Sequence, residues 1–390
     1  SRVSVTPWIV LGVVWVTLGV TFGLFFSFTI FFIPLVEEFR WSRGLTAGAF
    51  SLSTVIQGVL SPGIGLLVDR FGPRRVMLAG TLLLSGASLL ASRIQSLWQL
   101  YLITGVLAAT GVAAVGWVPC GALLTAWFRK RRGAVMGLAF SGMGVGVLAV
   151  GPLAQWLIAH VGWRQSYVLL GLGTLLFLGP LLWFGIIEAP ARSARTEAHT
   201  PSPVDGIGIS GALRTGAFWG LFLTYFFTPL AVFPVFTHQV AFSVDQGFPR
   251  MFVAGIFGLM GFMSSIGRIV FGVVSDRIGR ALVVAISFGC TAGGTGALLL
   301  LEVWPQEGWL YAYALLFGLG FGARGPIITA MAAELFAGRR FGAIYGVMNL
   351  GNGLGAAIGP WFGGVVHDMT GSYRLAFLTA MGFCAVAALC

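Results

Sequence analysis

The sequence predicts an all-α membrane protein with twelve transmembrane helices, arranged as two pseudo-symmetric six-helix bundles. Three observations predict this fold class: the composition, the spacing of long apolar segments, and motifs that recur between the two halves of the chain. The chain is 57% hydrophobic and only 9% charged, whereas soluble domains carry about 25% charged residues. Its 58 glycines suit closely packed membrane helices, because small residues let helix backbones approach each other. We therefore expect a lipid bilayer to surround most of the chain.

The apolar segments give the order of the elements. An apolar stretch of about 20 residues is long enough to cross a bilayer as a helix, and the sequence contains twelve such stretches. The polar segment 188–215, rich in proline, alanine, serine and threonine, predicts a flexible linker. It separates an N-terminal six-helix bundle at 1–187 from a C-terminal six-helix bundle at 216–390, whose last helix we expect to be truncated. The predicted spans are 8–35, 45–67, 76–92, 98–127, 134–159, 165–187, 216–241, 250–274, 281–301, 308–332, 342–366 and 373–390.

Loop charges indicate the orientation of these helices. Most of the 23 lysine and arginine residues fall in the loops that lie on the same side as the N-terminus. Cytoplasmic loops carry an excess of these residues, so both termini and the linker are predicted to be cytoplasmic. This distribution explains the net charge of +11 better than nucleic-acid binding does, because the basic residues lie in short loops between apolar segments. We therefore expect no nucleic-acid partner.

The sequence offers no catalytic or metal-binding pattern. Its four cysteines lie in apolar segments without the spacing of a disulfide framework or a zinc site, and its four histidines are scattered. No nucleophile and base stand at a spacing typical of an enzyme. We therefore expect no metal, no cofactor and no enzymatic activity.

Two motifs recur between the halves at almost the same offset. The segment GLLVDRFGPRR at 65–75 returns as GVVSDRIGR at 272–280, an offset of 207 residues. The segment RGAVMG at 132–137 returns as FGAIYG at 341–346, an offset of 209 residues. A shared offset for separate motifs indicates duplication of a six-helix unit, with a cavity expected between the two bundles.

The repeated loop places an aspartate and several arginines at the predicted cytoplasmic rim of each bundle. Each aspartate can face a helix N-terminus or an arginine of the other half, and such contacts would hold the cytoplasmic side closed. The alternative is that these charges only set the orientation of the chain. The predicted gating residues are Asp69, Arg70, Arg74, Arg132, Asp276, Arg277, Arg280 and Arg340.

Two arginines, Arg268 and Arg324, lie inside predicted spans that contain no acidic residue. A charged residue at the centre of a membrane helix costs about 2.5–3.5 kcal/mol on insertion scales, so such residues usually mark a substrate path. Two cations without a neutralising carboxylate predict a site for an anion. The alternative for Arg268 is a side chain that extends to the aqueous interface. For Arg324 it is a structural role in a helix bent by the surrounding glycines and Pro326.

Several uncharged polar residues are predicted to share this site. Tyr345, Asn349 and Asn352 are spaced so that they lie on one face of their helix. Gln57 and Tyr225 are weaker candidates of the same kind. Polar side chains also hold membrane helices together, and this alternative remains open for all five residues.

One histidine, His238, lies near the outer end of its predicted span. Because a histidine changes charge close to neutral pH, His238 is a candidate for sensing or passing a proton. The alternative is an interfacial histidine without a role in coupling.

The two halves differ in chemistry. The arginines and asparagines of the predicted site lie in the second half, whereas the first half offers a phenylalanine-rich first span. This asymmetry predicts a substrate with a charged end and an organic end, because an arginine matches a carboxylate bidentately. The alternative is that the phenylalanines serve packing or lipid contact.

These motifs resemble those of the major facilitator superfamily, whose signature loop is similar to GLLVDRFGPRR between the second and third spans. The resemblance covers essentially the whole chain and implies two bundles that work by alternating access. LFFSFTIFFIPLVEEFRWSR, SSIGRIVFGVVSDRIGR and RRFGAIYGVMNLGNGLGAAIGP further resemble the bacterial branch related to monocarboxylate porters and oxalate–formate antiporters. This likeness implies a multi-pass protein of the bacterial inner membrane, with Arg268 at the position of the substrate-binding arginine.

Some positions depart from the pattern of that branch. Ser264 stands where animal-type monocarboxylate porters have an acidic residue, and the first span lacks their lysine. The second cation of the oxalate antiporters lies in the eleventh span, whereas this chain has Met348 and Asn349 there and carries Arg324 in the tenth. Neither proton-coupled lactate transport nor oxalate exchange therefore carries over intact.

The combined prediction is a monomeric secondary active transporter for small organic anions, such as mono- or dicarboxylates. The expected mechanism is proton-coupled symport or anion exchange. The alternative is an exporter of drugs or other amphipathic compounds. Two buried arginines without a buried carboxylate argue against a cationic cargo.

Overall fold

Helices make up almost all of the computed structural model, which describes residues 6–128, 132–187, 209–336 and 341–390. The elements of the first half are α1 (Thr6–Phe26), α2 (Phe28–Phe39), α3 (Arg43–Phe71), α4 (Pro73–Ala91), α5 (Leu97–Leu100), the π-helical η1 (Tyr101–Ala108), α6 (Ala109–Val115), α7 (Trp117–Trp127) and α8 (Arg132–Gly185). Those of the second half are α9 (Ile209–Ala212), α10 (Gly216–Asp245), α11 (Arg250–Ile278), α12 (Arg280–Leu300), α13 (Glu307–Leu335), α14 (Phe341–Thr370) and α15 (Arg374–Leu389).

The predicted apolar segments coincide with these helices, and their ends differ by a few residues. The first segment is formed by α1 and α2, which meet at Ser27. The fourth contains a break at Gly116, where the backbone leaves helical geometry. Helix α8 covers two predicted segments, which are separated by a break at Gly162, where φ is 79°, a left-handed conformation that glycine adopts without steric cost.

Within the described ranges, nine helical stretches are long and apolar enough to cross a membrane. One of them, Val135–Gly185, contains the break at Gly162. Helix α15 is also apolar but has only 16 residues. The described chain is therefore an all-helical structure with several membrane-crossing helices.

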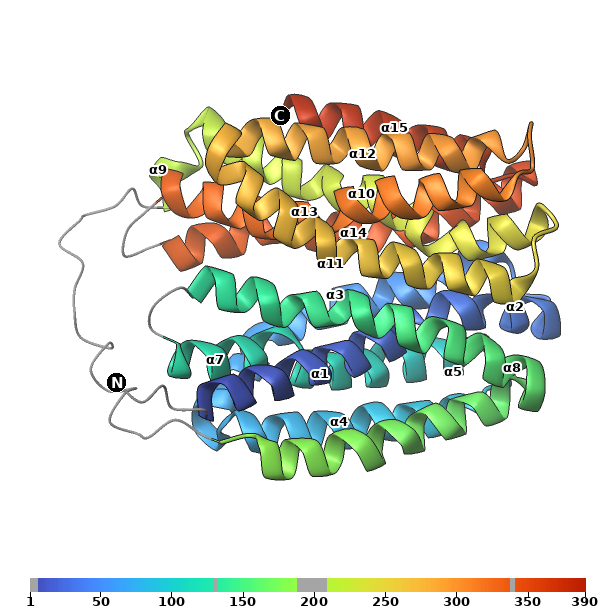
Figure 1. Ribbon diagram of the computed structural model, residues 1–390, viewed down its shortest axis with the longest axis horizontal. Coiled ribbons are helices and arrows are strands. Elements are labelled where there is room, and N and C mark those ends of the chain that lie inside the picture. Colours follow the sequence, from blue (N-terminus) through green and yellow to red (C-terminus); the bar gives the residue numbers. More distant parts are fainter. Residues whose placement is uncertain (1–5, 129–131, 188–208, 337–340) are drawn as a thin grey trace.

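The helices form two bundles that lie side by side (Figure 1). In the first bundle, drawn blue to green, α1 and α4 pack on α8. In the second bundle, drawn yellow to red, α13 packs on α11 and α12, and α10 packs on α14 and α15. The bundles meet where α8 packs on α11, α3 on α14, and α2 on α10. Buried apolar side chains from both bundles form one continuous cluster across this interface.

Glycines bring α8 and α11 into direct backbone contact. A Cβ atom added at Gly144 would overlap the carbonyl oxygen of Gly261 and Oγ of Ser265. One added at Gly261 would overlap the side chain of Val147. On the same helix α8, by contrast, a Cβ atom at Gly137 would meet nothing within 4 Å. Small residues are thus required where the two bundles touch, as is usual for closely packed membrane helices.

Candidate functional site

Arg268 lies where the two bundles meet. Its guanidinium group extends from α11 to α8, where Nη1 donates a hydrogen bond of 2.5 Å to the carbonyl oxygen of Phe140. Ser265, about one turn earlier on α11, makes a second bond to α8, because its Oγ donates to the carbonyl oxygen of Ser141 at 2.5 Å. The side chain of Arg268 is half-buried, and its described partner belongs to the opposite bundle. Its predicted role in substrate binding stays a prediction.

Aromatic side chains of the first bundle lie next to this contact. The ring centroid of Trp117, at the start of α7, is 4.5 Å from that of Phe140 and 5.7 Å from that of Phe22. Phe26 continues the row, with its ring centroid 5.7 Å from Phe22 and 4.9 Å from Phe236 of the second bundle. Trp117 is nevertheless 48% exposed. We call Phe22, Phe26, Trp117 and Phe140 the aromatic wall; Trp117 and Phe140 were not predicted as site residues from the sequence.

Arg324 lies elsewhere, inside the second bundle. It is only 1% exposed, and its Nη2 donates a hydrogen bond of 2.9 Å to Oγ1 of Thr291 on α12. Its Cζ stands 4.5 Å from the ring centroid of Phe288, also on α12. The described partners of Arg268 and Arg324 thus belong to different bundles, and no described contact joins the two arginines.

Two predicted polar residues do meet. The hydroxyl oxygen of Tyr225 on α10 lies 3.2 Å from that of Tyr345 on α14. The hydroxyl of Thr329 on α13 lies 2.9 Å from Tyr225 and 3.0 Å from Tyr345. Three helices of the second bundle therefore share one cluster of hydroxyl groups. Thr329 was not predicted, because its Oγ1 donates to the carbonyl oxygen of Gly325, four residues earlier, as an ordinary helical threonine does.

The other predicted polar residues are half-buried or lie outside the described side chains. Gln57 is half-buried on α3, and Asn352 is half-buried on α14. The side chain of Asn349 lies outside the described residues.

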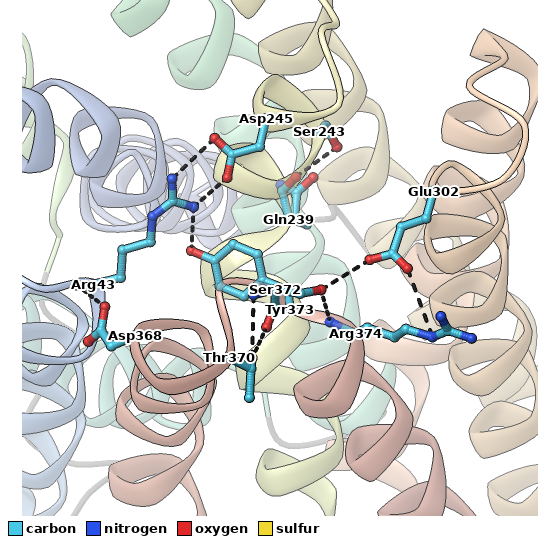
Figure 2. Close-up of polar contacts among 10 residues, drawn as sticks. All are labelled: Arg43, Gln239, Ser243, Asp245, Glu302, Asp368, Thr370, Ser372, Tyr373 and Arg374. Carbon is cyan, nitrogen blue, oxygen red and sulfur yellow. Dashed lines mark hydrogen bonds and ion pairs between the residues drawn. The ribbon is translucent and has the colours of Figure 1, made fainter.

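A network of ion pairs joins the bundles at the rim formed by the ends of α2 and α10 and the starts of α3 and α11. The Nη1 and Nη2 atoms of Arg43 lie 2.5 Å and 3.1 Å from the two carboxylate oxygens of Asp245 (Figure 2). Nη1 also donates to the hydroxyl oxygen of Tyr373 at 2.9 Å. The backbone N–H groups of Arg43 and Gly44 donate to the carboxylate of Asp368 at 2.9 Å and 2.7 Å.

A second ion pair joins the bundles at the same rim, with its arginine on the second bundle and its carboxylate on the first. Nη2 of Arg250 on α11 lies 2.5 Å from Oε1 of Glu37 on α2. The offset of 207 residues that relates the repeated loops also relates Arg43 to Arg250, and it places Asp245 opposite Glu38, next to Glu37. We call the pairs Arg43–Asp245 and Arg250–Glu37 the reciprocal ion pairs.

Local chain geometry explains where these charges stand. Ser42 caps α3 by accepting a hydrogen bond from the backbone N–H of Leu45, and Pro249 precedes α11, so Arg43 and Arg250 are the first residues of their helices. A cation at a helix N-terminus and an anion at a C-terminus are both unfavourable with the helix dipole. The ion pairs offset that cost for Arg43 and for Asp245, the last residue of α10. From the sequence these arginines were expected to be loop charges, and the network was not predicted.

His238 lies beside this network. It is fully buried, and its Nε2 is 2.9 Å from the carbonyl oxygen of Pro360 on α14. Its ring centroid is 4.9 Å from that of Tyr373 and 5.3 Å from that of Phe32. The ring centroid of His367 also lies close to Tyr373, at 4.4 Å. Two histidine rings thus contact the tyrosine that Arg43 contacts.

The predicted gating residues at the opposite rim do not form a described contact between the bundles. Asp69, Arg70 and Arg277 are exposed. The Cζ atom of Arg74 stacks 4.6 Å from the Trp183 ring, within the first bundle, and Arg280 pairs with Glu334 at 2.5 Å, within the second. Arg340 and the side chains of Arg132 and Asp276 lie outside the described residues. Between described residues, the ion pairs that join the bundles are those of the Arg43 rim.

The sequence of the chain is similar to those of known transporters. The family model of the Major Facilitator Superfamily matches residues 14–329 and 305–390. Bovine monocarboxylate transporter 13 is 28% identical over 365 residues, which cover 94% of this chain and 84% of that protein. Rat monocarboxylate transporter 4 is 28% identical over 385 residues, covering 96% of this chain and 79% of that protein. The uncharacterized MFS-type transporter YcxA of Bacillus subtilis is 24% identical over 375 residues, covering 93% and 88% of the two chains.

A solved structure shares the fold. It is a bacterial homologue of the human lysosomal transporter Spinster, in an inward-facing and unoccupied conformation. The TM-score is 0.75 with 15% sequence identity, and the match covers 100% of this chain and 96% of that chain.

Proposed function

The chain belongs to the major facilitator superfamily and is a transporter rather than an enzyme, and from this premise we propose that it moves small organic anions by alternating access. Mono- or dicarboxylates are the proposed cargo, taken up with protons or exchanged for another anion. The similarity to relatives named as monocarboxylate transporters supports this substrate class.

The proposed topology places twelve spans in a bacterial inner membrane, with both termini in the cytoplasm. The bundles at 1–187 and 216–390, joined by a linker at 188–215, are proposed to descend from a duplication, and a monomer suffices for function. In this orientation the Arg43 rim faces outward and the rim of Asp69 and Arg70 faces the cytoplasm. The reciprocal ion pairs then hold the outer side closed, which corresponds to an inward-facing state.

One observation carries the proposal: Arg268 is a permanent cation at the contact between the bundles. A guanidinium group has five N–H donors, and the described hydrogen bond to the neutral carbonyl oxygen of Phe140 uses one of them. A carboxylate is a stronger acceptor than a carbonyl and fits the guanidinium fork bidentately. An arriving anion therefore competes for Arg268, and its binding changes a contact that joins the two bundles.

The aromatic wall is the proposed partner for the organic part of the cargo. Trp117 presents about half of its surface beside the backbone segment that holds Arg268. An exposed aromatic face offers apolar contact to a substrate without a second charge. We therefore assign the carboxylate to Arg268 and the apolar body to the aromatic wall, as the chemical difference between the halves predicts.

Other residues take supporting roles in this proposal. The hydroxyl groups of Tyr225 and Tyr345, together with Gln57, Asn349 and Asn352, are the candidates for polar contacts to the substrate. His238 is the candidate for proton coupling because it lies beside the Arg43 network. For Arg324 we favour the structural alternative, because its guanidinium is buried against Phe288 and Thr291.

An exporter of amphipathic compounds is the second candidate, and the exposed ring of Trp117 is the observation that favours it. Amphipathic compounds bind aromatic surfaces without needing a cation, so their transport would not depend on Arg268.

Uptake into proteoliposomes tests the proposal. Purified protein is reconstituted, and uptake of a panel of labelled mono- and dicarboxylates is compared for the unaltered chain, Arg268→Lys, Arg268→Gln and the control Arg93→Gln, which removes an exposed loop arginine. We expect both Arg268 variants to lose uptake, with melting temperatures and gel-filtration profiles unchanged, and the control to retain it. Full carboxylate uptake by Arg268→Gln would contradict the proposal. Export of amphipathic dyes that is indifferent to Arg268 would favour the second candidate.

A further inference from the structure

We propose that a pocket at the rim of the first bundle binds the phosphate group of an anionic phospholipid. The pocket has a volume of about 800 Å³ and lies between the turn that joins α3 to α4 and the end of α8. Its walls include three arginines, Arg70, Arg74 and Arg75, and the apolar side chains of Trp183 and Phe184. This rim is at the left end of the lower bundle in Figure 1.

The charge of the pocket favours an anion. In the part of the chain that the structure describes, none of these three arginines forms an ion pair. Arg74 is held instead by the ring of Trp183, with its Cζ 4.6 Å from the ring centroid. Gly72, which precedes the 19-residue helix α4, also lines the pocket, so the N-terminus of α4 and the positive end of its dipole lie there. Three guanidinium groups and a helix N-terminus thus face one space.

The apolar walls favour a lipid over a free anion. Trp183 is 55% exposed and Phe184 is 79% exposed, at the end of an apolar helix. Tryptophan and tyrosine are enriched where membrane helices leave the hydrocarbon region, and Trp183 fits this position. Basic pockets between helices at this depth are suited to lipid headgroups. A phospholipid can place its phosphate against the arginines and its acyl chains along Phe184, whereas a soluble phosphate makes no use of the apolar side.

The second copy of the loop lacks this arrangement. The offset of 207 residues relates Arg70 to Arg277 and Pro73 to Arg280. Arg280 is paired with Glu334 at 2.5 Å, so its charge is neutralised within its own bundle. The unpaired cluster is therefore a property of the first bundle and does not follow from the repeated motif alone. This inference does not depend on which substrate the protein carries.

Native mass spectrometry of the full chain tests the site. The protein is released from detergent in the presence of phosphatidylglycerol or phosphatidylcholine, and bound lipid is counted at increasing lipid concentration. We compare the unaltered chain with the double variant Arg74→Gln/Arg75→Gln, with Trp183→Leu, and with the matched control Arg277→Gln in the second loop. We expect selective retention of phosphatidylglycerol by the unaltered chain and the control, and about tenfold weaker retention by the double variant.

Two results would overturn the inference. One is equal retention of phosphatidylglycerol by the double variant, by Trp183→Leu and by the control. The other is a rise in melting temperature with inorganic phosphate or glycerol 3-phosphate that equals the rise with phosphatidylglycerol, which would make the pocket a site for soluble anions. Trp183→Leu keeps all three arginines, so it tests the lipid component even if the double variant folds poorly.

Discussion

Arg43 and Asp245 form a two-point ion pair between the bundles, with nitrogen–oxygen distances of 2.5 Å and 3.1 Å across 202 residues of sequence. Arg43 is the first residue of α3 and Asp245 the last residue of α10. The pair therefore links a helix start in one bundle to a helix end in the other. Together with Arg250 and Glu37 it closes the rim that the proposed topology places outside the cell.

Breaking this pair is expected to favour the outward-open state. The side chains of Arg43 and Asp245 are 20% and 41% exposed, and partly exposed pairs contribute about 0.2–1 kcal/mol. Arg43→Gln should therefore raise the outward-open population by up to about fivefold. Electron–electron distance measurements between spin labels at Arg40 and Val303, on exposed loops of different bundles, would show a longer distance.

The control for this experiment is Arg374→Gln, which removes the ion pair with Glu302 inside the second bundle at the same rim. It should leave the distance distribution unchanged. Identical distributions for Arg43→Gln and Arg374→Gln would show that the pair does not hold the rim closed.

Trp117 is expected to set the preference among carboxylates. Removal of the exposed ring in Trp117→Ala should weaken transport of aryl or long-chain carboxylates by about tenfold, in line with the value of aromatic contacts, and leave acetate nearly unaffected. Competition assays in proteoliposomes give the ratio of the two affinities. Trp98→Ala, which removes another exposed tryptophan, should leave that ratio unchanged. An equal loss for acetate and aryl carboxylates would assign Trp117 to folding instead of to selectivity.

Gly144 is expected to tolerate no larger side chain. In Gly144→Ala the new methyl group would overlap the carbonyl oxygen of Gly261, and overpacking of this kind costs about 1–3 kcal/mol. The melting temperature should fall, and the hydrogen bond between Arg268 and Phe140 should lengthen. Gly137→Ala, on the same helix with open space around it, should be neutral or stabilising, since alanine is the better helix former. A Gly144→Ala protein as stable as Gly137→Ala would mean that the bundles are packed more loosely at Gly144 than the structure shows.

A substitution at His238 is expected to distinguish proton-coupled uptake from anion-for-anion exchange. His238→Gln keeps a polar group of similar reach but cannot take up a proton. If His238 carries the coupling proton, uptake driven by a proton gradient should be lost and anion-for-anion exchange should persist. His160→Gln, which changes an exposed histidine on α8, serves as the control. Gradient-driven accumulation by His238→Gln at the level of the control would exclude His238 as the coupling group.

The helices could be predicted from the sequence because long apolar stretches separated by polar loops leave the backbone few alternatives. The break at Gly162 fell between two predicted segments, and the superfamily resemblance is confirmed. The side of the helix on which Arg324 lies could not be assigned from the sequence. Its helix is apolar on all sides, so the sequence periodicity does not indicate which face is turned toward the interior of the bundle. The partners of Arg43 could not be predicted either, since Asp245 and Asp368 reach it only through the packing of the two bundles.

The direct contact between Gly144 and Gly261 has a mechanical consequence. It lies between the reciprocal ion pairs and the Arg268–Phe140 bond, at a point where the backbones of α8 and α11 touch. A rigid rotation about an axis through this point moves the two ends of the interface in opposite directions and leaves the backbone contact in place. Separation of the charges at one end and approach of the helices at the other are then a single movement about the place where the two backbones come closest.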